Sequence, residues 1–189
     1  MVLSSVLIGN AISLVACSIS AVSGYVKSKN KTLIMQTIQL SMSMIACIVL
    51  QSLSGAVLNA LAVPRNILAC KEKLNFPAKL IISILSAGLA VFFVVCQSIY
   101  DNHIVWVGLV PIIPTVLYTL YLDKADGIRF KLLVIQLMVF WTVHDMLIKS
   151  YVSSIFNVIQ ILLSLVAIIR IRIEKQKGMI AIENNGDEL

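Results

Sequence analysis

Seven stretches of about 20 mostly apolar residues follow one another along the chain, and this pattern restricts the fold more than any other feature. A helix needs about 20 such residues to cross the hydrocarbon core of a bilayer. The stretches cover residues 2–25, 32–50, 52–70, 78–98, 104–122, 129–148 and 151–171. Hydrophobic residues make up 59% of the 189 residues and charged residues 13%, which leaves too few polar side chains for a water-exposed globular surface. The sequence therefore predicts an all-α integral membrane protein with seven transmembrane helices. It excludes a soluble enzyme, a disordered chain and a nucleic-acid-binding domain.

The basic residues support the count of seven and predict an orientation. With seven spans, 14 of the 15 Lys and Arg residues lie on one face of the membrane, and Lys149 is the exception. Loops rich in Lys and Arg stay in the cytoplasm. We therefore expect a multi-pass membrane protein with the N-terminus outside and the C-terminus in the cytoplasm. The net charge of +6 then needs no nucleic-acid partner.

The two halves of the chain repeat each other at an offset near 98 residues. Residues 52–59 align with 150–157, and residues 38–40 align with 135–137. Spans 1–3 then match spans 5–7, and the extra crossing of span 4 gives both halves the same orientation. We predict two parallel three-helix-bundle repeats joined by a linker helix (3+1+3), with a solute cavity between them. The predicted units are residues 1–73, the linker helix 74–101, residues 102–177, and an irregular cytoplasmic tail 178–189.

Amide side chains are the candidate ligands for a solute within the spans. Asn59 and Asn157 are repeat mates near mid-depth of spans 3 and 7. The other candidates are Gln39 with its mate Gln136, and Asn10 and Gln160. No Asp, Glu, Lys or Arg falls at mid-depth of a predicted span, and amides donate and accept hydrogen bonds without titrating. This pattern predicts a cavity walled by spans 1, 3, 5 and 7 for a small neutral polar metabolite moving down its gradient. Alternatively, the same amides hold the helices together.

Proline and a His–Asp pair suggest further roles. Pro64 in span 3 and Pro111 and Pro114 in span 5 are candidate hinges, because proline removes a helical hydrogen bond; a static kink is the alternative.

His144 and Asp145 near the outer end of span 6 form a candidate proton-coupling or gating pair. An interfacial cap, in which Asp145 pairs with Lys149, is the plainer reading. Trp141 fits an interfacial belt or stacks on a ring-shaped solute.

Catalytic and metal-binding patterns do not emerge from the sequence. The four cysteines have no C-x-x-C spacing, and no nucleophile is joined by a base and an orienting group. We therefore expect no enzyme, no cofactor and no metal site. The expected partners are the lipid bilayer and a small-molecule solute, and a homo-oligomer stays open. The alternative function is a non-transporting accessory protein that binds a partner or lipid, which would have a filled core and a lateral groove.

Several motifs carry a resemblance to known families. Residues 140–145 (Phe-Trp-Thr-Val-His-Asp), residues 150–157, Ile168-Ile169-Arg170 and residues 55–60 followed by Arg65 resemble the YgjV family of bacterial inner membrane proteins. The 3+1+3 plan is more distantly similar to the SWEET and SemiSWEET sugar facilitators and to PnuC-type vitamin transporters. In SWEET proteins two asparagines on the third and seventh helices face the sugar, and the resemblance implies this role for Asn59 and Asn157. The proline-glutamine motif of those transporters is absent, since Pro64 precedes Arg65.

Overall fold

The computed structural model describes residues 2–50, 53–101, 106–147 and 150–186. It confirms an all-α membrane protein of about seven helices. The helices are α1 (Val2–Tyr25), α2 (Lys29–Val49), α3 (Leu53–Cys70), α4 (Phe76–Asp101), the 3-10 helix η1 (Trp106–Leu109), α5 (Ile112–Tyr121), α6 (Gly127–Leu147) and α7 (Tyr151–Gly186). Six of the described helices are long and apolar enough to span a membrane, and the segment Trp106–Tyr121 is a shorter apolar one.

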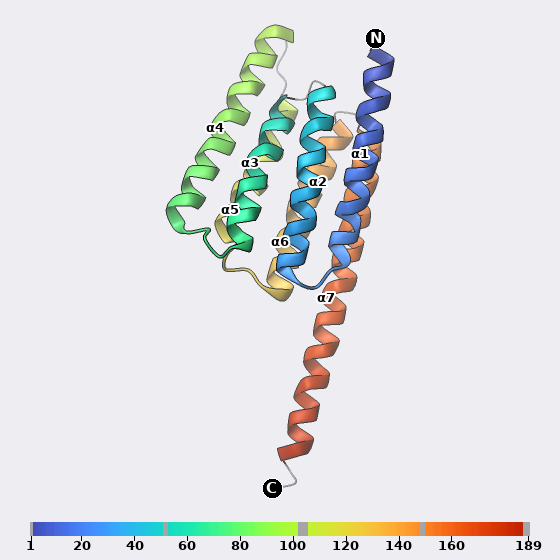
Figure 1. The fold of residues 1–189 in the computed structure, drawn as a ribbon, viewed down its shortest axis with the longest axis vertical. Coiled ribbons are helices and arrows are strands. Elements are labelled where there is room, and N and C mark those ends of the chain that lie inside the picture. Colours follow the sequence, from blue (N-terminus) through green and yellow to red (C-terminus); the bar gives the residue numbers. More distant parts are fainter. Residues whose placement is uncertain (1, 51–52, 102–105, 148–149, 187–189) are drawn as a thin grey trace.

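The helices form a ring in which each one packs against its neighbour in the chain. The ring closes where α1 packs against α7. Figure 1 shows α1 and α7 both running downward from the top of the bundle, as an odd number of crossings requires. The loops α1–α2, α3–α4 and α5–α6 lie together at the lower end. These loops and the residues after span 7 carry the basic residues, so we call this the basic end and the other the opposite end.

Span 5 is broken rather than continuous. The prediction was one helix over residues 104–122, of which 104 and 105 lie outside the described residues. The structure has η1, then Pro111 immediately before α5, and Pro114 in the first turn of α5. Proline has no backbone N–H to continue a helical ladder, and it fits the start of a helix. Pro64 differs, because it lies inside α3.

The C-terminal segment departs from the predicted irregular tail. We expected residues 178–189 to lack structure, but α7 continues to Gly186 and contains 36 residues. Glu, Lys, Gln, Met and Ala dominate residues 174–182 and all have high helix propensity, so the helix does not end at the membrane boundary. At 1.5 Å per residue it is about 54 Å long, well beyond the roughly 30 Å of hydrocarbon. The other predicted boundaries between repeat units stay predictions.

A hydrophobic cluster closes the bundle at the basic end. Its buried members come from α2 to α6 and their loops: Leu33, Ala69, Leu74, Ile82, Tyr118, Leu122, Ala125, Phe130, Val134 and Leu137. A much smaller cluster of Leu58, Ala90 and Ile112 lies between α3, α4 and α5. We refer to the larger set as the basic-end core. It fills the interior below the site described next.

Buried and paired cations strengthen the basic end. Lys79 donates to the Asp123 carboxylate at 2.8 Å and so ties α4 to the loop before α6. Burial tends to raise the pKa of Asp123, but the hydrogen bond and charge of Lys79 outweigh it and hold this pKa below its usual range. Lys27 pairs with Glu174 and so ties the α1–α2 loop to α7. Some of the basic residues from which we predicted the membrane orientation therefore also hold helices together.

Lys131 links α6 to the end of α1, and its removal is expected to destabilise the protein. The side chain is fully buried, and its Nζ donates to the carbonyl oxygens of Ser23 and Gly24 at 3.2 and 3.0 Å. The partial negative charge at the C-terminal end of α1 also stabilises a cation at this position. Lys131→Met should lower the unfolding free energy in detergent by about 1.5–3 kcal/mol. Lys124→Met, at an exposed position, is the control and should have little effect; equal stability of both variants would contradict the link.

Candidate functional site

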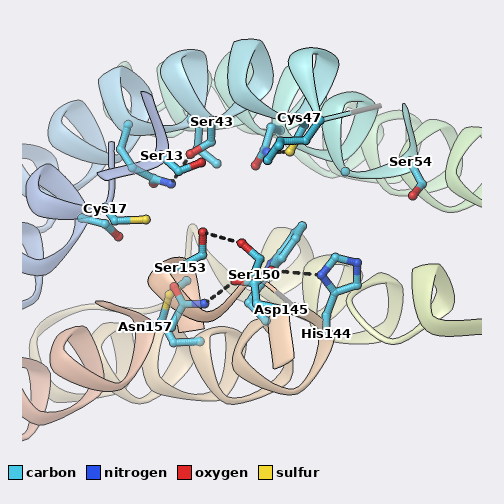
Figure 2. Close-up of a pocket in the computed structure, with 18 of the residues that line it drawn as sticks. Ser13, Cys17, Ser43, Cys47, Ser54, His144, Asp145, Ser150, Ser153 and Asn157 are labelled. Atoms are coloured by element: carbon cyan, nitrogen blue, oxygen red, sulfur yellow. Dashed lines mark hydrogen bonds and ion pairs between the residues drawn. The ribbon is translucent and has the colours of Figure 1, made fainter. Parts of the chain in front are cut away.

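A central cavity of about 440 Å³ lies inside the ring. It is walled mainly by α1, α2 and α3 on one side and by α6 and α7 on the other, and Figure 2 shows labelled side chains from both walls facing one another. The expected walls were spans 1, 3, 5 and 7. Spans 2 and 6 contribute as well, because the ring places them beside spans 1 and 7, whereas α5 contributes nothing and span 5 reaches the cavity only through Val107 and Gly108.

Polar stripes at helical spacing form the walls. On α1, residues 10, 13, 17 and 20 recur every three or four positions, and on α2 residues 36, 39, 43 and 47 do the same. Such spacing places side chains on one face of a helix. The polar lining consists of the amides Asn10, Gln36, Gln39, Asn59, Gln97 and Asn157, the serines Ser13, Ser20, Ser43, Ser54, Ser150 and Ser153, and the charged or titratable groups Arg65, His144 and Asp145. The remaining lining side chains include Cys17, Cys47, Leu137, Met138 and Trp141.

The predicted repeat mates Asn59 and Asn157 both line the cavity. Each is the seventh residue of its helix, α3 or α7, so both lie at a similar depth below the opposite end. Asn59 is buried, and its Nδ2 donates to Cys47 Sγ at 3.6 Å. Asn157 Nδ2 donates to Asp145 Oδ2 at 2.8 Å. The two amides are therefore placed by neighbouring helices rather than by each other.

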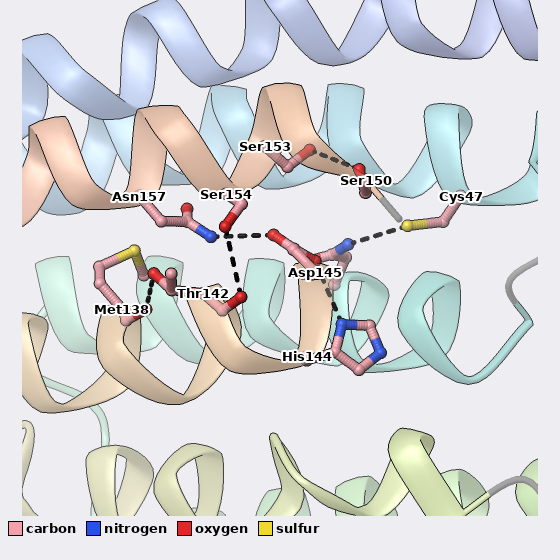
Figure 3. A network of polar contacts seen from close by, with 10 residues as sticks. Cys47, Met138, Thr142, His144, Asp145, Ser150, Ser153, Ser154 and Asn157 are labelled. Carbon is pink, nitrogen blue, oxygen red and sulfur yellow. Dashed lines mark hydrogen bonds and ion pairs between the residues drawn. The ribbon is translucent and has the colours of Figure 1, made fainter. Parts of the chain in front are cut away.

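Asp145 is the centre of a polar network at this depth. It is buried in the last turns of α6, and its Oδ1 lies 3.1 Å from His144 Nδ1 while its other oxygen accepts from Asn157 (Figure 3). Ser154 Oγ contacts the Thr142 carbonyl oxygen at 3.4 Å in the same view, which joins α7 to α6 again. The predicted pairing with Lys149 lies outside the described residues. In the part of the chain that the structure describes, Asp145 faces the cavity rather than the membrane interface.

The other predicted residues divide between the cavity and the helix contacts. Asn10, Gln39 and Trp141 line the cavity, and Trp141 packs edge-on against His144 with ring centroids 5.2 Å apart. Gln136 is half-buried and does not line it. Gln160 is fully buried between α7 and α1, where it accepts from Ser20 Oγ and donates to Ser23 Oγ at 3.3 Å. For Gln160, the alternative role of the amides applies: its side chain holds two helices together and does not face the cavity.

Arg65 corrects the prediction of an uncharged lining. We counted it among the basic residues near the end of span 3, but its side chain is 3% exposed and lines the cavity. A signal for this position was present in the sequence. Residues 55, 58, 62, 65 and 69 follow each other at intervals of three and four, so Arg65 shares the buried face of α3 with Gly55. With Asp145 also in the lining, the cavity is not restricted to a neutral solute.

The cavity is one-sided. Its lining reaches Leu50 at the end of α2 and Ser150 just before α7, both at the opposite end of the bundle. Toward the basic end the lining stops near Gln36 and Leu137, and Leu137 belongs to the basic-end core. The chamber is therefore blocked toward the basic end by packed apolar side chains.

Comparison with known proteins gives the family. The model of the family Imp-YgjV, described as bacterial inner membrane protein, matches residues 7–175. This match includes every residue of the cavity lining. No curated protein and no solved structure matches the chain. The chain belongs to the Imp-YgjV family and is a bacterial inner membrane protein with multiple apolar helices.

Proposed function

We propose that this YgjV family protein is a membrane transporter that binds one small polar solute in the central cavity and moves it across the inner membrane. The single observation that carries the proposal is the polar chamber inside a ring of membrane-spanning helices. Its volume of about 440 Å³ falls within the range of small-molecule sites. Polar side chains are costly at membrane depth and are typically kept there for a solute or water pathway.

The arrangement of the cavity favours transport over an accessory role. An accessory protein that only binds a partner or lipid needs no polar chamber between its helices and is better served by a filled core. A chamber that is blocked toward one end is also the form that an alternating-access transporter takes in one of its end states. We further propose the predicted orientation, with the basic end in the cytoplasm, which makes the present state closed toward the cytoplasm.

The proposed transport is facilitated diffusion. Asp145 is the single carboxylate in the described lining, and Asn157 and His144 already contact it. A chain of several acidic or His groups, as ion-driven pumps use, is not found among the described lining residues. The electrochemical gradient of the solute itself would therefore drive movement. We propose no catalytic reaction for this cavity.

A ligand screen followed by a transport assay tests the proposal. The purified protein is heated in detergent with sugars, nucleosides, vitamins, amino acids and small organic acids, and a bound ligand is expected to raise Tm. The compound that raises Tm is then loaded outside proteoliposomes without any ion gradient. We expect it to equilibrate across the membrane faster than in empty liposomes. Binding without any transport would contradict the proposal and favour the accessory role.

Thiol labelling tests the cavity without knowledge of the solute. Cys17 and Cys47 line the chamber, whereas Cys70 and Cys96 do not. Proteins that keep only one of these cysteines are treated with a small water-soluble maleimide. If the chamber is filled with water, as we propose, Cys47 should react, and the ligand from the screen should slow this reaction. Cys96, which is exposed on the span α4, is the control for a lipid-facing thiol and should react less. A Cys47 as inert as Cys96 would indicate a dry interior.

A further inference from the structure

Arg65 presents a buried guanidinium to the cavity without a neutralising partner. It lies on α3, 3% exposed, and no described carboxylate is within 4.0 Å of it. The described chain has two other buried cations. Lys79 pairs with Asp123, and Lys131 donates to two carbonyl oxygens at the end of α1. Arg65 differs from Lys79 because it has no carboxylate partner, and it differs from both lysines because it lines the cavity.

The contacts of Arg65 fix the guanidinium but leave donors free. Its Nε and one terminal nitrogen both donate to Asn66 Oδ1, at 3.1 and 3.0 Å, and the other terminal nitrogen has a long 3.5 Å contact with Thr119 Oγ1. The group also stacks over the Tyr118 ring, 4.6 Å from its centroid. A guanidinium carries five N–H donors, so two have no partner among the described residues. One of them is on each terminal nitrogen, and the two terminal nitrogens of a guanidinium can bind two oxygens of one group at once.

Such an arrangement is costly unless a ligand completes it. A buried guanidinium that keeps unpaired donors carries a desolvation cost that a ligand could offset, and intramembrane charges are mostly functional. Asn66 and Tyr118 hold the side chain in one position, which lowers the entropic cost of binding a ligand there. A planar guanidinium with a free fork matches the oxygens of a carboxylate or a phosphate. We propose that the transported solute carries an oxyanion group, a carboxylate or phosphate, that binds Arg65. This inference rests on the proposed function and specifies its substrate class.

The opposite part of the cavity sets a second requirement for the solute. Arg65 is six residues beyond Asn59 on α3, so about 9 Å of helix rise separates them. At the depth of Asn59 the lining offers Asp145, an acceptor, together with amides and serines. A solute whose oxyanion lies at Arg65 would therefore place hydroxyl or amino groups there. The expected class is a small polyhydroxylated or amino-bearing acid or phosphate.

Matched ligands test the proposal in the full-length protein. Thermal shifts are compared for gluconate, its amide gluconamide and the uncharged glucitol, for glucose 6-phosphate against glucose, and for hydroxy and amino acids against their amides. We expect at least one oxyanion to bind about tenfold or more tightly than its neutral mate. The carboxylate and phosphate arms identify which group is recognised. Arg65→Gln should abolish this preference, and Arg65→Lys should weaken it. Arg129→Gln, at an exposed position of α6, is the matched control and should leave it unchanged.

The outcomes separate this inference from the proposed function. If neutral compounds bind and are transported as well as their oxyanion mates, the inference is wrong and the transporter proposal stands. If no compound binds or is transported, both this inference and the proposed function are wrong. If Arg65→Gln does not fold, phenylglyoxal modification of the wild-type protein replaces it. The bound oxyanion should then protect Arg65 while Arg129, Arg170 and Arg172 react as before, and unprotected Arg65 would refute the inference.

Discussion

Asn157→Asp is expected to abolish solute uptake and to lower the stability of the bundle. The amide of Asn157 donates to the Asp145 carboxylate at 2.8 Å, and both side chains are at the cavity wall. A second carboxylate at this position replaces a donor by a like charge. Two unit charges about 4 Å apart repel by about 4 kcal/mol at an effective dielectric constant of 20. We expect a lower Tm in detergent and no detectable uptake of the compound found in the ligand screen.

An exchange of the two side chains is the sharpest control for this prediction. The double variant Asp145→Asn with Asn157→Asp again has one carboxylate and one amide in contact. It should regain most of the Tm lost in the single variant, and part of the uptake. A single variant that is as stable as the wild type would contradict the contact between α6 and α7. A double variant that is no more stable than the single variant would show that the two groups do not act as a pair.

Gly24→Leu is expected to separate α1 from α7, the contact that closes the ring. A Cβ at Gly24 would lie 2.8 Å from the backbone oxygen of Gln160, which cannot move without displacing α7. Overpacking of this kind typically costs 1–3 kcal/mol, and a backbone obstacle places the cost at about the upper end. We expect a large fall in the Tm of the purified protein and loss of the polar contacts between Gln160 and α1.

Gly88 provides the matched control for this substitution. It also lies within a long helix, α4, but a Cβ there meets nothing within 4 Å. Gly88→Leu should therefore leave Tm unchanged or raise it slightly, since leucine favours helix more than glycine does. Equal Tm values for the two variants would contradict the close approach of α1 and α7.

The helices could be predicted from the sequence because the bilayer dictates them. Each span must satisfy its own backbone hydrogen bonds, so an apolar stretch of sufficient length leaves no alternative to a helix. The break of span 5 at Pro111 was harder to predict from the sequence, since many membrane helices contain a proline without ending there. The extension of α7 to Gly186 was missed because hydropathy detects the membrane and not the helix.

The site could be predicted only in part. Asn59 and Asn157 emerged from the internal repeat, and both line the cavity. Gln160 was chosen only as a further amide in span 7, without a repeat mate, and it faces α1, because the rotation of α7 about its axis depends on packing that no amide pattern reveals. Arg65 was missed because its charge drew attention to membrane orientation rather than to the buried stripe on which it lies.

The packed apolar side chains at the basic end would determine how the proposed transporter conducts its solute. A solute that moved from the chamber toward the basic end would meet Leu137 and the rest of that core rather than an aqueous channel. In each turnover these side chains would have to separate and repack, so throughput would be governed by conformational exchange instead of free diffusion. At rest the membrane would stay sealed to protons and small ions, which allows a cell to hold many copies without dissipating its membrane potential.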